Sequence, residues 1–309
     1  MLRSALLWAS QNKTIARRLP SYRFARKAVT RFMPGEHVDD ALRAGEMLRQ
    51  QGIPTVITRL GENITESREA DDVRIHYADV LATIAGLKQE TQISVKPTQL
   101  ALDIDEARCV SNLQSLADHA RKLSNFVWID MEYSSYVDRT IAAFDKVREQ
   151  HSNVGLCIQA YLHRTSKDLE HLLKSTTAIR LVKGAYREPA NVAIQSKKDV
   201  DQAYLQLATR LLEETATGRE VGAPPAFATH DVNMLSRITK MARDLGIPND
   251  AFEIQMLYGI QRTEQMRLAK EGYRVRVLIS YGSAWFPWYM RRLAERPANV
   301  WFLIKNLVS

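Results

Sequence analysis

Two adjacent arginines near the C-terminal end of the chain are the first candidates for binding an acidic ligand. Arg291 and Arg292 follow Trp288 by three and four residues, a spacing that places indole and guanidinium groups on one face of a helix. A guanidinium binds a carboxylate through two parallel hydrogen bonds, and an aromatic wall excludes competing water. Because Glu295 lies three and four residues further on, a plain ion pair on the helix surface is an equally open interpretation.

A second group of polar residues shares one position, at or just after the C-terminal end of a predicted strand. Its members are Lys96, Asp130, Gln159, Lys183, His230, Gln255 and Tyr281. A single residue of this kind could simply meet water, but a set on one rim indicates a binding pocket. A lysine at such a rim could also form a Schiff base with a carbonyl substrate. A lysine-dependent aldolase acting through Lys96 or Lys183 is therefore an alternative.

The elements that position these side chains follow from an alternation of short β-rich runs with long amphipathic segments. The runs that we interpret as strands are residues 54–57, 92–95, 126–130, 155–159, 179–182, 226–230, 252–256 and 274–279. Each precedes a segment long enough for a crossover helix, which indicates a parallel sheet. Eight such units predict the α/β class and a closed (βα)8 TIM-type barrel, with its site on the loops after the strands.

The ends of the chain complete this domain plan. We expect an N-terminal helical arm at residues 1–50, with a helix over 38–50, and a barrel domain at 51–309. A last helix should begin near Ser283, tolerate Pro287 in its first turn, and stop before Pro297. The basic start of the arm could form an amphipathic helix on anionic lipid, although packing on the barrel is the preferred interpretation.

Several classes of site are disfavoured by motifs that the sequence lacks. It has no GxG, so neither a Rossmann fingerprint nor a Walker loop is present, and it has no GxSxG elbow. It also has no HxH or HExxH, which argues against a dedicated metal site. Cys109 and Cys157 stand in no ligand spacing, so a reduced, cytoplasmic protein is the simpler expectation.

Composition leaves the binding partner open. The chain has 309 residues, a net charge of +8 and a pI of about 9.4, and its basic residues are scattered. Positive charge of this kind could attract nucleic acid, anionic substrates or an anionic membrane, and charge alone does not choose among them. A non-enzymatic basic barrel is therefore a further alternative, which salt-sensitive binding without turnover would favour.

Five motifs in order along the strands resemble the proline dehydrogenase family. They are IQAYLHR from Ile158, RLVKGAYREP from Arg180, ATHD from Ala228, EIQMLYGI from Glu253 and WFPWYMRRLAERPAN from Trp285. The combination of RLVKGAY with a terminal MRRLAER is specific, and the similarity runs from the N-terminus to about Ile304. The likeness is greatest to the short, monofunctional bacterial members.

This resemblance implies a flavoenzyme with FAD held noncovalently at the C-terminal rim of the barrel and the last helix lying over it. The positions matching FAD-binding residues of the family are Gln159, Arg180, Val182, Lys183, Gly184, Ala185, His230, Gln255 and Leu257, with Asp130 and Glu295 added at the edge of the set. Lys96, Arg291 and Arg292 match residues that bind the substrate carboxylate, and Asp130 matches an acid that supports the pocket. No metal is implied.

The implied reaction is hydride transfer to the flavin from the ring carbon beside the amine of L-proline, giving 1-pyrroline-5-carboxylate in the first step of proline catabolism. The resemblance also suggests a quinone acceptor at the membrane, approached by a cytoplasmic protein peripheral to its inner face, and no nucleic-acid partner. It leaves the oligomeric state open.

The sequence departs from the family pattern at the expected substrate wall. Leu278 and Trp288 stand where family members have tyrosines that pack on the proline ring. Ser280 stands where proline is common, and Pro97 follows Lys96 where leucine is common. A shorter wall at one side and a larger ring at the other could favour hydroxyproline or another substituted or larger cyclic amino acid.

Overall fold

The protein contains a closed barrel of eight parallel strands in the order β1-β2-β3-β4-β5-β6-β7-β8. The structure, a computed structural model, describes residues 29–61, 64–175, 178–218 and 223–295, with side chains as far as residue 290 in the last helix. The strands are β1 (Thr55–Arg59), β2 (Thr91–Val95), β3 (Val127–Ile129), β4 (Val154–Gln159), β5 (Ala178–Val182), β6 (Ala226–Ala228), β7 (Glu253–Leu257) and β8 (Arg274–Tyr281). The predicted (βα)8 fold is thus confirmed.

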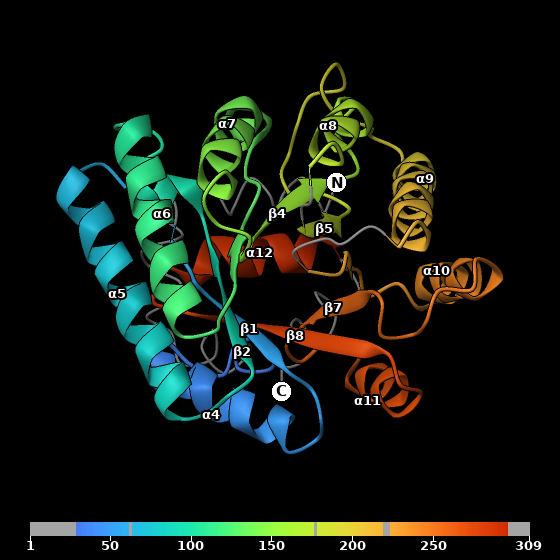
Figure 1. Ribbon diagram of the computed structural model, residues 1–309, viewed down its shortest axis with the longest axis horizontal. Coiled ribbons are helices and arrows are strands. Elements are labelled where there is room, and N and C mark those ends of the chain that lie inside the picture. The colour runs from blue at the N-terminus through green and yellow to red at the C-terminus, as the bar shows by residue number, and fades with distance from the viewer. Residues whose placement is uncertain (1–28, 62–63, 176–177, 219–222, 296–309) are drawn as a thin grey trace, which may run out of the picture.

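Helices connect the strands and surround the barrel, as Figure 1 shows. They are α4 (Val38–Arg49), α5 (Ser67–Gly86), α6 (Glu106–Lys122), α7 (Val137–Arg148), α8 (Thr165–Leu172), α9 (Lys197–Ala216), α10 (Val232–Asp244), α11 (Arg262–Lys270) and α12 (Trp285–Glu295), with short 3-10 helices η2 (Pro97–Leu100) and η3 (Ser134–Tyr136). The last helix, α12, crosses the centre of the ring in this view. It begins at Trp285, two residues later than expected, so Ala284 and not Ser283 precedes it.

Part of the predicted N-terminal arm shares the barrel core. Ala41, Leu42 and Ala44 of α4 are buried in the main hydrophobic cluster, together with residues of the strands and of the outer helices. The helix was predicted at 38–50 and is found at Val38–Arg49. Residues 1–28 lie outside the described residues, so the amphipathic start of the arm and the boundary at residue 50 stay predictions. None of the described helices is both long and apolar enough to cross a membrane.

Alternation along the strands separates the residues that face the helices from those that face the barrel interior. On β8, Val277 and Ile279 belong to the main core between barrel and helices. Leu278 and Ser280 line an internal cavity, and Leu278 packs on the small apolar cluster inside the barrel. One strand therefore supplies the outer core with one set of alternate residues and the barrel interior with the other.

The barrel interior below the cavity is closed by an aromatic side chain and an ion pair. Gly155 makes room for Trp128, since a Cβ at residue 155 would lie 2.6 Å from the indole Cζ3. Arg276 donates from Nε to both oxygens of Glu253, at 2.9 and 3.0 Å, and both residues are buried. Arg276 Nη1 also donates to the backbone oxygen of Thr55 at 3.0 Å. These bonds join β7, β8 and β1 inside the barrel.

Replacing Arg276 with leucine leaves the Glu253 carboxylate buried without its cation. We expect the free energy of unfolding to fall by about 3–5 kcal/mol, as measured by urea denaturation. Arg267→Leu on α11 is the matched control, because its ion pairs with Glu264 and Glu271 are solvent-exposed. That variant should lose less than about 1 kcal/mol. Equal losses in the two variants would contradict a stabilising role for the buried pair.

Candidate active site

A cavity of about 1040 Å³ opens at the C-terminal ends of the strands. This volume is at the upper end of the range of roughly 300–1,000 Å³ for small-molecule and cofactor sites. Its lining includes six of the seven predicted rim residues, namely Lys96, Asp130, Gln159, Lys183, His230 and Gln255. Tyr281 also stands at a strand end, as predicted, but it does not line this cavity. It ends β8 on the outward face, where its hydroxyl lies 2.7 Å from His76 Nε2 on α5.

A charged network joins three strands at the floor of the cavity. The Asp130 carboxylate, just after β3, accepts hydrogen bonds from Lys96 Nζ at 3.1 Å and from Arg180 Nη1 at 3.0 Å. Ser94 Oγ donates to the same carboxylate at 2.7 Å, and Arg180 also stacks over the Trp128 ring at 4.5 Å. Among Lys96, Arg180 and Asp130, two cations meet one carboxylate. The network therefore fixes both cations beside the cavity through one shared carboxylate.

The charge of Asp130 depends on these partners. Burial of the carboxyl would raise its pKa, but the charges of Lys96 and Arg180 and the hydrogen bonds from Ser94 and Lys96 act in the opposite direction. Their combined effect holds the pKa of Asp130 below its ordinary value of 3.8. Asp130 is consequently an anion at neutral pH and acts as a fixed partner for both cations.

Two glutamines face the cavity with their amide nitrogens already engaged. Gln159 Nε2 donates to the backbone oxygens of Met131 and Glu132, at 2.9 and 3.1 Å. Gln255 Nε2 donates to Glu253 Oε1 at 2.6 Å. In the part of the chain that the structure describes, Oε1 of both glutamines and Nε and Nη2 of Arg180 are buried without a hydrogen-bond partner. The site thus has two oriented acceptors and one cationic donor available for a polar ligand.

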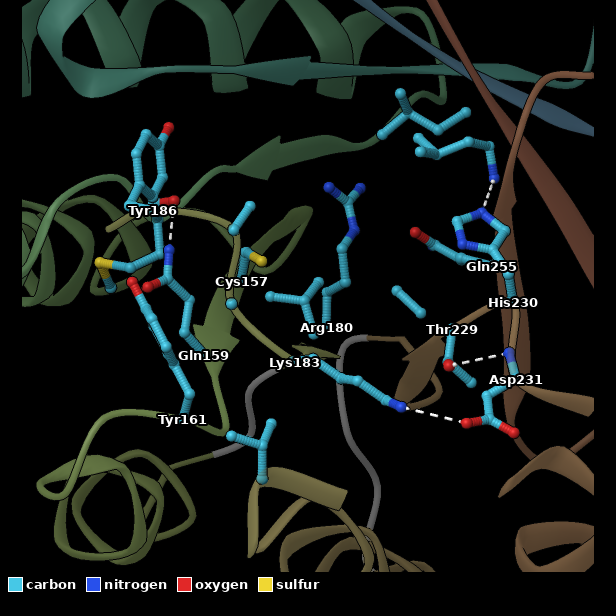
Figure 2. Close-up of a pocket in the computed structure, with 18 of the residues that line it drawn as sticks. Cys157, Gln159, Tyr161, Arg180, Lys183, Tyr186, Thr229, His230, Asp231 and Gln255 are labelled. Atoms are coloured by element: carbon cyan, nitrogen blue, oxygen red, sulfur yellow. Dashed lines mark hydrogen bonds and ion pairs between the residues drawn. The ribbon is translucent and has the colours of Figure 1, made fainter. Parts of the chain in front are cut away.

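The opposite side of the cavity carries a second group of charges. Lys183 Nζ pairs with Asp201 Oδ1 at 2.5 Å and with Asp231 Oδ2 at 3.2 Å. Figure 2 shows Lys183 extending toward Asp231, while Arg180 projects into the space between Gln159 and Gln255. His230 accepts a hydrogen bond on Nε2 from the backbone N–H of Leu257 at 2.9 Å, so the ring orients the end of β7.

Strand β3 ends one residue earlier than predicted, and strand β6 ends two residues earlier. Asp130 and His230 follow β3 and β6 and are not part of them. Asp231 caps α10 by accepting from Met234 N at 3.3 Å. Strand β6 ends at Ala228, so both His230 and Asp231 lie in the connection between β6 and α10.

The packing of the fold requires glycine at residue 184. Its φ is +115°, and a Cβ there would lie 2.1 Å from Cδ1 of the Tyr161 ring. Glycine is required because a side chain would be strained and would collide with the tyrosine. Gly184 also lines the cavity, so its predicted place beside the cofactor stays a prediction.

Leu278 and Trp288 both line the cavity, on the side of β8 and α12. The departures from the family pattern therefore lie at a cavity wall. Ser280 is also in this wall, and Pro97 begins η2 directly after Lys96.

The remaining predicted site residues fall into two groups. Arg291, Arg292 and Glu295 belong to α12, but their side chains lie outside the described residues. Val182, Ala185 and Leu257, predicted to contact FAD, line the cavity as well.

Sequence reasoning missed several polar residues of the cavity. Asp201 comes from α9, far along the chain from Lys183, and no local pattern connects the two. Cys157 was placed correctly in a strand but its position at the cavity was not foreseen. Burial raises the pKa of Cys157 to about 12, so its thiol is protonated and a poor nucleophile at neutral pH.

Within the described ranges, no three His, Cys, Asp or Glu side chains form a group that could hold a metal ion.

A closed parallel barrel with a charged cavity at the C-terminal ends of its strands is the arrangement of the (βα)8-barrel enzymes. A family model described as proline dehydrogenase matches residues 41–305, and the chain belongs to the proline dehydrogenase family. It is 34% identical to proline dehydrogenase 1 of Bacillus subtilis (strain 168) over 310 residues, which cover all of both chains. It is 35% identical to proline dehydrogenase of Deinococcus radiodurans over 286 residues, covering 90% of this chain and 89% of the relative.

Among solved structures, the chain is similar to proline utilization A (PutA) from Bdellovibrio bacteriovorus, inactivated by N-propargylglycine. The TM-score is 0.81 at 25% sequence identity, and the match covers 96% of this chain. Only 36% of the PutA chain is covered, so this protein corresponds to about a third of that larger one.

Replacing Asp130 with asparagine leaves Lys96 and Arg180 without their shared anion. We expect a loss of about 3 kcal/mol in the free energy of unfolding at pH 7. Since the pKa of Asp130 is lowered in the folded state, its stabilising contribution is present above the ordinary value of 3.8 and is lost as the pH falls through the folded-state pKa. The difference between wild type and D130N in urea unfolding should shrink below about pH 4.

Asp118→Asn is the control for this pH series, because Asp118 forms an exposed ion pair with Arg121 at 2.8 Å. Its effect should be small at every pH, because solvent screens an exposed ion pair. A D130N difference that stays constant to about pH 3 would show that the carboxyl is not held anionic by the network.

Proposed function

We propose that this chain is an FAD-dependent dehydrogenase that oxidises L-proline or a related cyclic amino acid. The observation that carries the proposal is the cavity in which the Lys96–Asp130–Arg180 network lies beside two oriented glutamine oxygens. The family membership and the names of the two bacterial relatives support proline as the substrate class.

The residues present fit a flavin. An isoalloxazine offers both N–H donors and carbonyl acceptors along one edge, and it needs fixed partners of both kinds. Gln159 Oε1 and Gln255 Oε1 are buried acceptors, and Arg180 Nε and Nη2 are buried donors, all without a partner among the described residues. Buried polar groups are normally satisfied, which supports a polar ligand here. When bound, FAD would supply the two-electron acceptor that amino-acid oxidation requires.

The substrate carboxylate is assigned to the side of β2, β8 and α12. Lys96 supplies one cation there, and its hydrogen bond to Asp130 limits where the ammonium can move. We assign the second and third cations to Arg291 and Arg292 on the basis of the family match. An acid held by several cations has a fixed orientation, and orientation of the reacting carbon is the contribution that this kind of reaction needs from the protein.

In the proposed reaction, the ring CH2 carbon beside nitrogen, which does not bear the carboxylate, gives up one hydrogen with the bonding electron pair, and the amine loses a proton. The C–N bond becomes C=N, so proline gives 1-pyrroline-5-carboxylate, and the electron pair leaves with the hydride. The largely apolar wall formed by Leu278 and Trp288 would keep water away from the reacting carbon.

The wall at Leu278 favours a second candidate substrate, a substituted or larger ring. Leu278 and Trp288 line the cavity at the positions where family members have tyrosine. Leucine has no hydroxyl and a shorter side chain, so this side of the pocket offers more room than a tyrosine would leave. Hydroxyproline and pipecolate are therefore included as substrates of the same chemistry.

The aldolase alternative has less support. Both candidate lysines donate to carboxylates, Lys96 to Asp130 and Lys183 to Asp201 and Asp231. A nucleophilic amine would first have to break these ion pairs.

As the physiological electron acceptor we propose a quinone at the inner face of the membrane. The protein would be cytoplasmic and would bind to that face peripherally.

Anaerobic titration followed by visible spectroscopy tests cofactor and substrate together. Protein purified with added FAD should show flavin absorbance, and cyclic amino acids should bleach it. We expect kcat/KM for hydroxyproline or pipecolate to equal or exceed that for proline, and Leu278→Tyr to shift the preference toward proline by about tenfold. A clear wild-type preference for proline would refute the altered specificity. Protein that binds no flavin would refute the proposed function.

Arg291→Ala and Arg292→Ala test the carboxylate assignment. Loss of a hydrogen bond to a charged group is worth about 1.5–3 kcal/mol, so KM should rise about 10-fold to 150-fold for each variant. Flavin content should remain that of wild type. Arg262→Ala is a control outside the proposed site, since its guanidinium stacks on Tyr258 at 5.4 Å. Unchanged KM in both test variants would remove these arginines from the site.

A further inference from the structure

The last helix is attached to the barrel by a hydrophobic cluster separate from the main core. We call it the cap cluster; it consists of Val29, Phe32, Met33, Leu60, Ile260, Trp285, Phe286, Trp288, Tyr289 and Met290. The main core contains none of the described side chains of α12. The core that stabilises the barrel therefore does not by itself fix the position of this helix.

Residues 29–36 provide the part of the cap cluster that comes from outside the barrel. Val29 and Met33 are only 3% and 1% exposed, although they lie in a segment with little regular structure. The Phe32 ring packs against Tyr289 with centroids 6.1 Å apart. Glu36 Oε1 accepts a hydrogen bond from Trp285 Nε1 at 3.1 Å. The segment thus contacts α12 by both apolar packing and a polar bond.

The same segment is in direct backbone contact with the loop after β7. Gly259 has a φ of +77°, and a Cβ at this position would lie 1.7 Å from the backbone oxygen of Arg31. No side-chain motion could relieve such a contact, because the obstacle is main chain. Segment 29–36 therefore touches the barrel rim at Gly259 and α12 at Trp285 and Tyr289.

Trp288 connects this packing to the cavity. It is a member of the cap cluster and also lines the cavity wall. Any shift of α12 would move the indole, and would move the backbone of Arg291 and Arg292, which continue the same helix.

We propose that segment 29–36 positions α12 over the cavity and so sets the affinity for the substrate without touching it. Its members are positioning residues. The proposal rests on the proposed function only in taking a cyclic amino acid as the ligand whose affinity is measured.

Gly259→Ala and Gly272→Ala form the central comparison. Both glycines have positive φ, +77° and +84°, so alanine carries a similar backbone strain at each. Only Gly259 faces Arg31, while a Cβ at Gly272 would have nothing within 4 Å. We expect G259A to raise KM for proline by about tenfold or more with kcat changed less than about twofold, the pattern of lost substrate binding. G272A should match wild type in both.

Hydrogen exchange supplies a readout that does not depend on turnover. In G259A the amides of residues 289–295 should exchange faster than in G272A, while those of β4 and β5 and the flavin content stay unchanged. Equal KM and equal exchange in the two glycine variants would overturn the proposal. So would a loss of flavin in G259A, because the effect would then reach the cofactor side of the cavity.

Trp285→Phe keeps the test decisive if G259A does not fold. Phenylalanine retains much of the packing but cannot donate to Glu36 Oε1. KM should rise about threefold or more, with the same local increase in exchange; wild-type values for both would overturn the proposal. A wild-type protein that binds flavin but is bleached by no cyclic amino acid would refute the proposed function. The exchange comparison of G259A with G272A would still decide whether the segment positions α12.

Discussion

The carboxylate of Asp130 lies between two cations that come from different strands, and the chemistry of the cavity depends on that arrangement. Without it, Lys96 and Arg180 would be two positive charges in a largely buried space, and burial of unpaired charge is costly. With it, the cations hold defined positions, Lys96 directly after β2 and Arg180 on β5. The arrangement is possible because alternate residues of a parallel barrel point inward, so β2, β3 and β5 can share one interior space.

The barrel separates the two parts of the proposed reaction. Strands β4 to β7 supply the anchored glutamines and Arg180, which suit a flat polar ligand. Strands β1, β2 and β8, with α12, supply Lys96, Leu278 and Trp288, which suit a small acid with an apolar ring. The strand β8 combines several tasks, because Arg276 closes the interior, Leu278 forms the wall and Val277 builds the outer core.

The sequence allowed the barrel to be predicted because each strand is a short run rich in β-branched and apolar residues between clear helical segments. Strand ends were less predictable, as at Ala228, where β6 ends although Thr229 and His230 continue the run that was predicted as strand. Counting alternate residues of β8 from the inward-facing Leu278 places Tyr281 on the outward face, where it meets His76. In the sequence alone, Tyr281 groups with the rim residues because it is polar and stands at a strand end.

Contacts between distant segments could not be predicted in this way. Nothing near Lys183 indicates Asp201 as its partner, and nothing near Arg31 indicates Gly259. Such pairs arise from the three-dimensional packing of helices and loops around the strands. The family resemblance located cavity residues one by one, Gly184 among them, but it did not indicate that the Tyr161 ring packs against this glycine.

The anchored amide of Gln159 has a consequence for how a ligand is received. Its nitrogen is committed to two main-chain oxygens, so the direction of its carbonyl dipole is established when the protein folds. A ligand that meets this oxygen does not have to select one rotamer from many or wait for solvent dipoles to rearrange. The polarity of this part of the cavity is preorganised, and the entropic cost of orienting the side chain has already been met during folding.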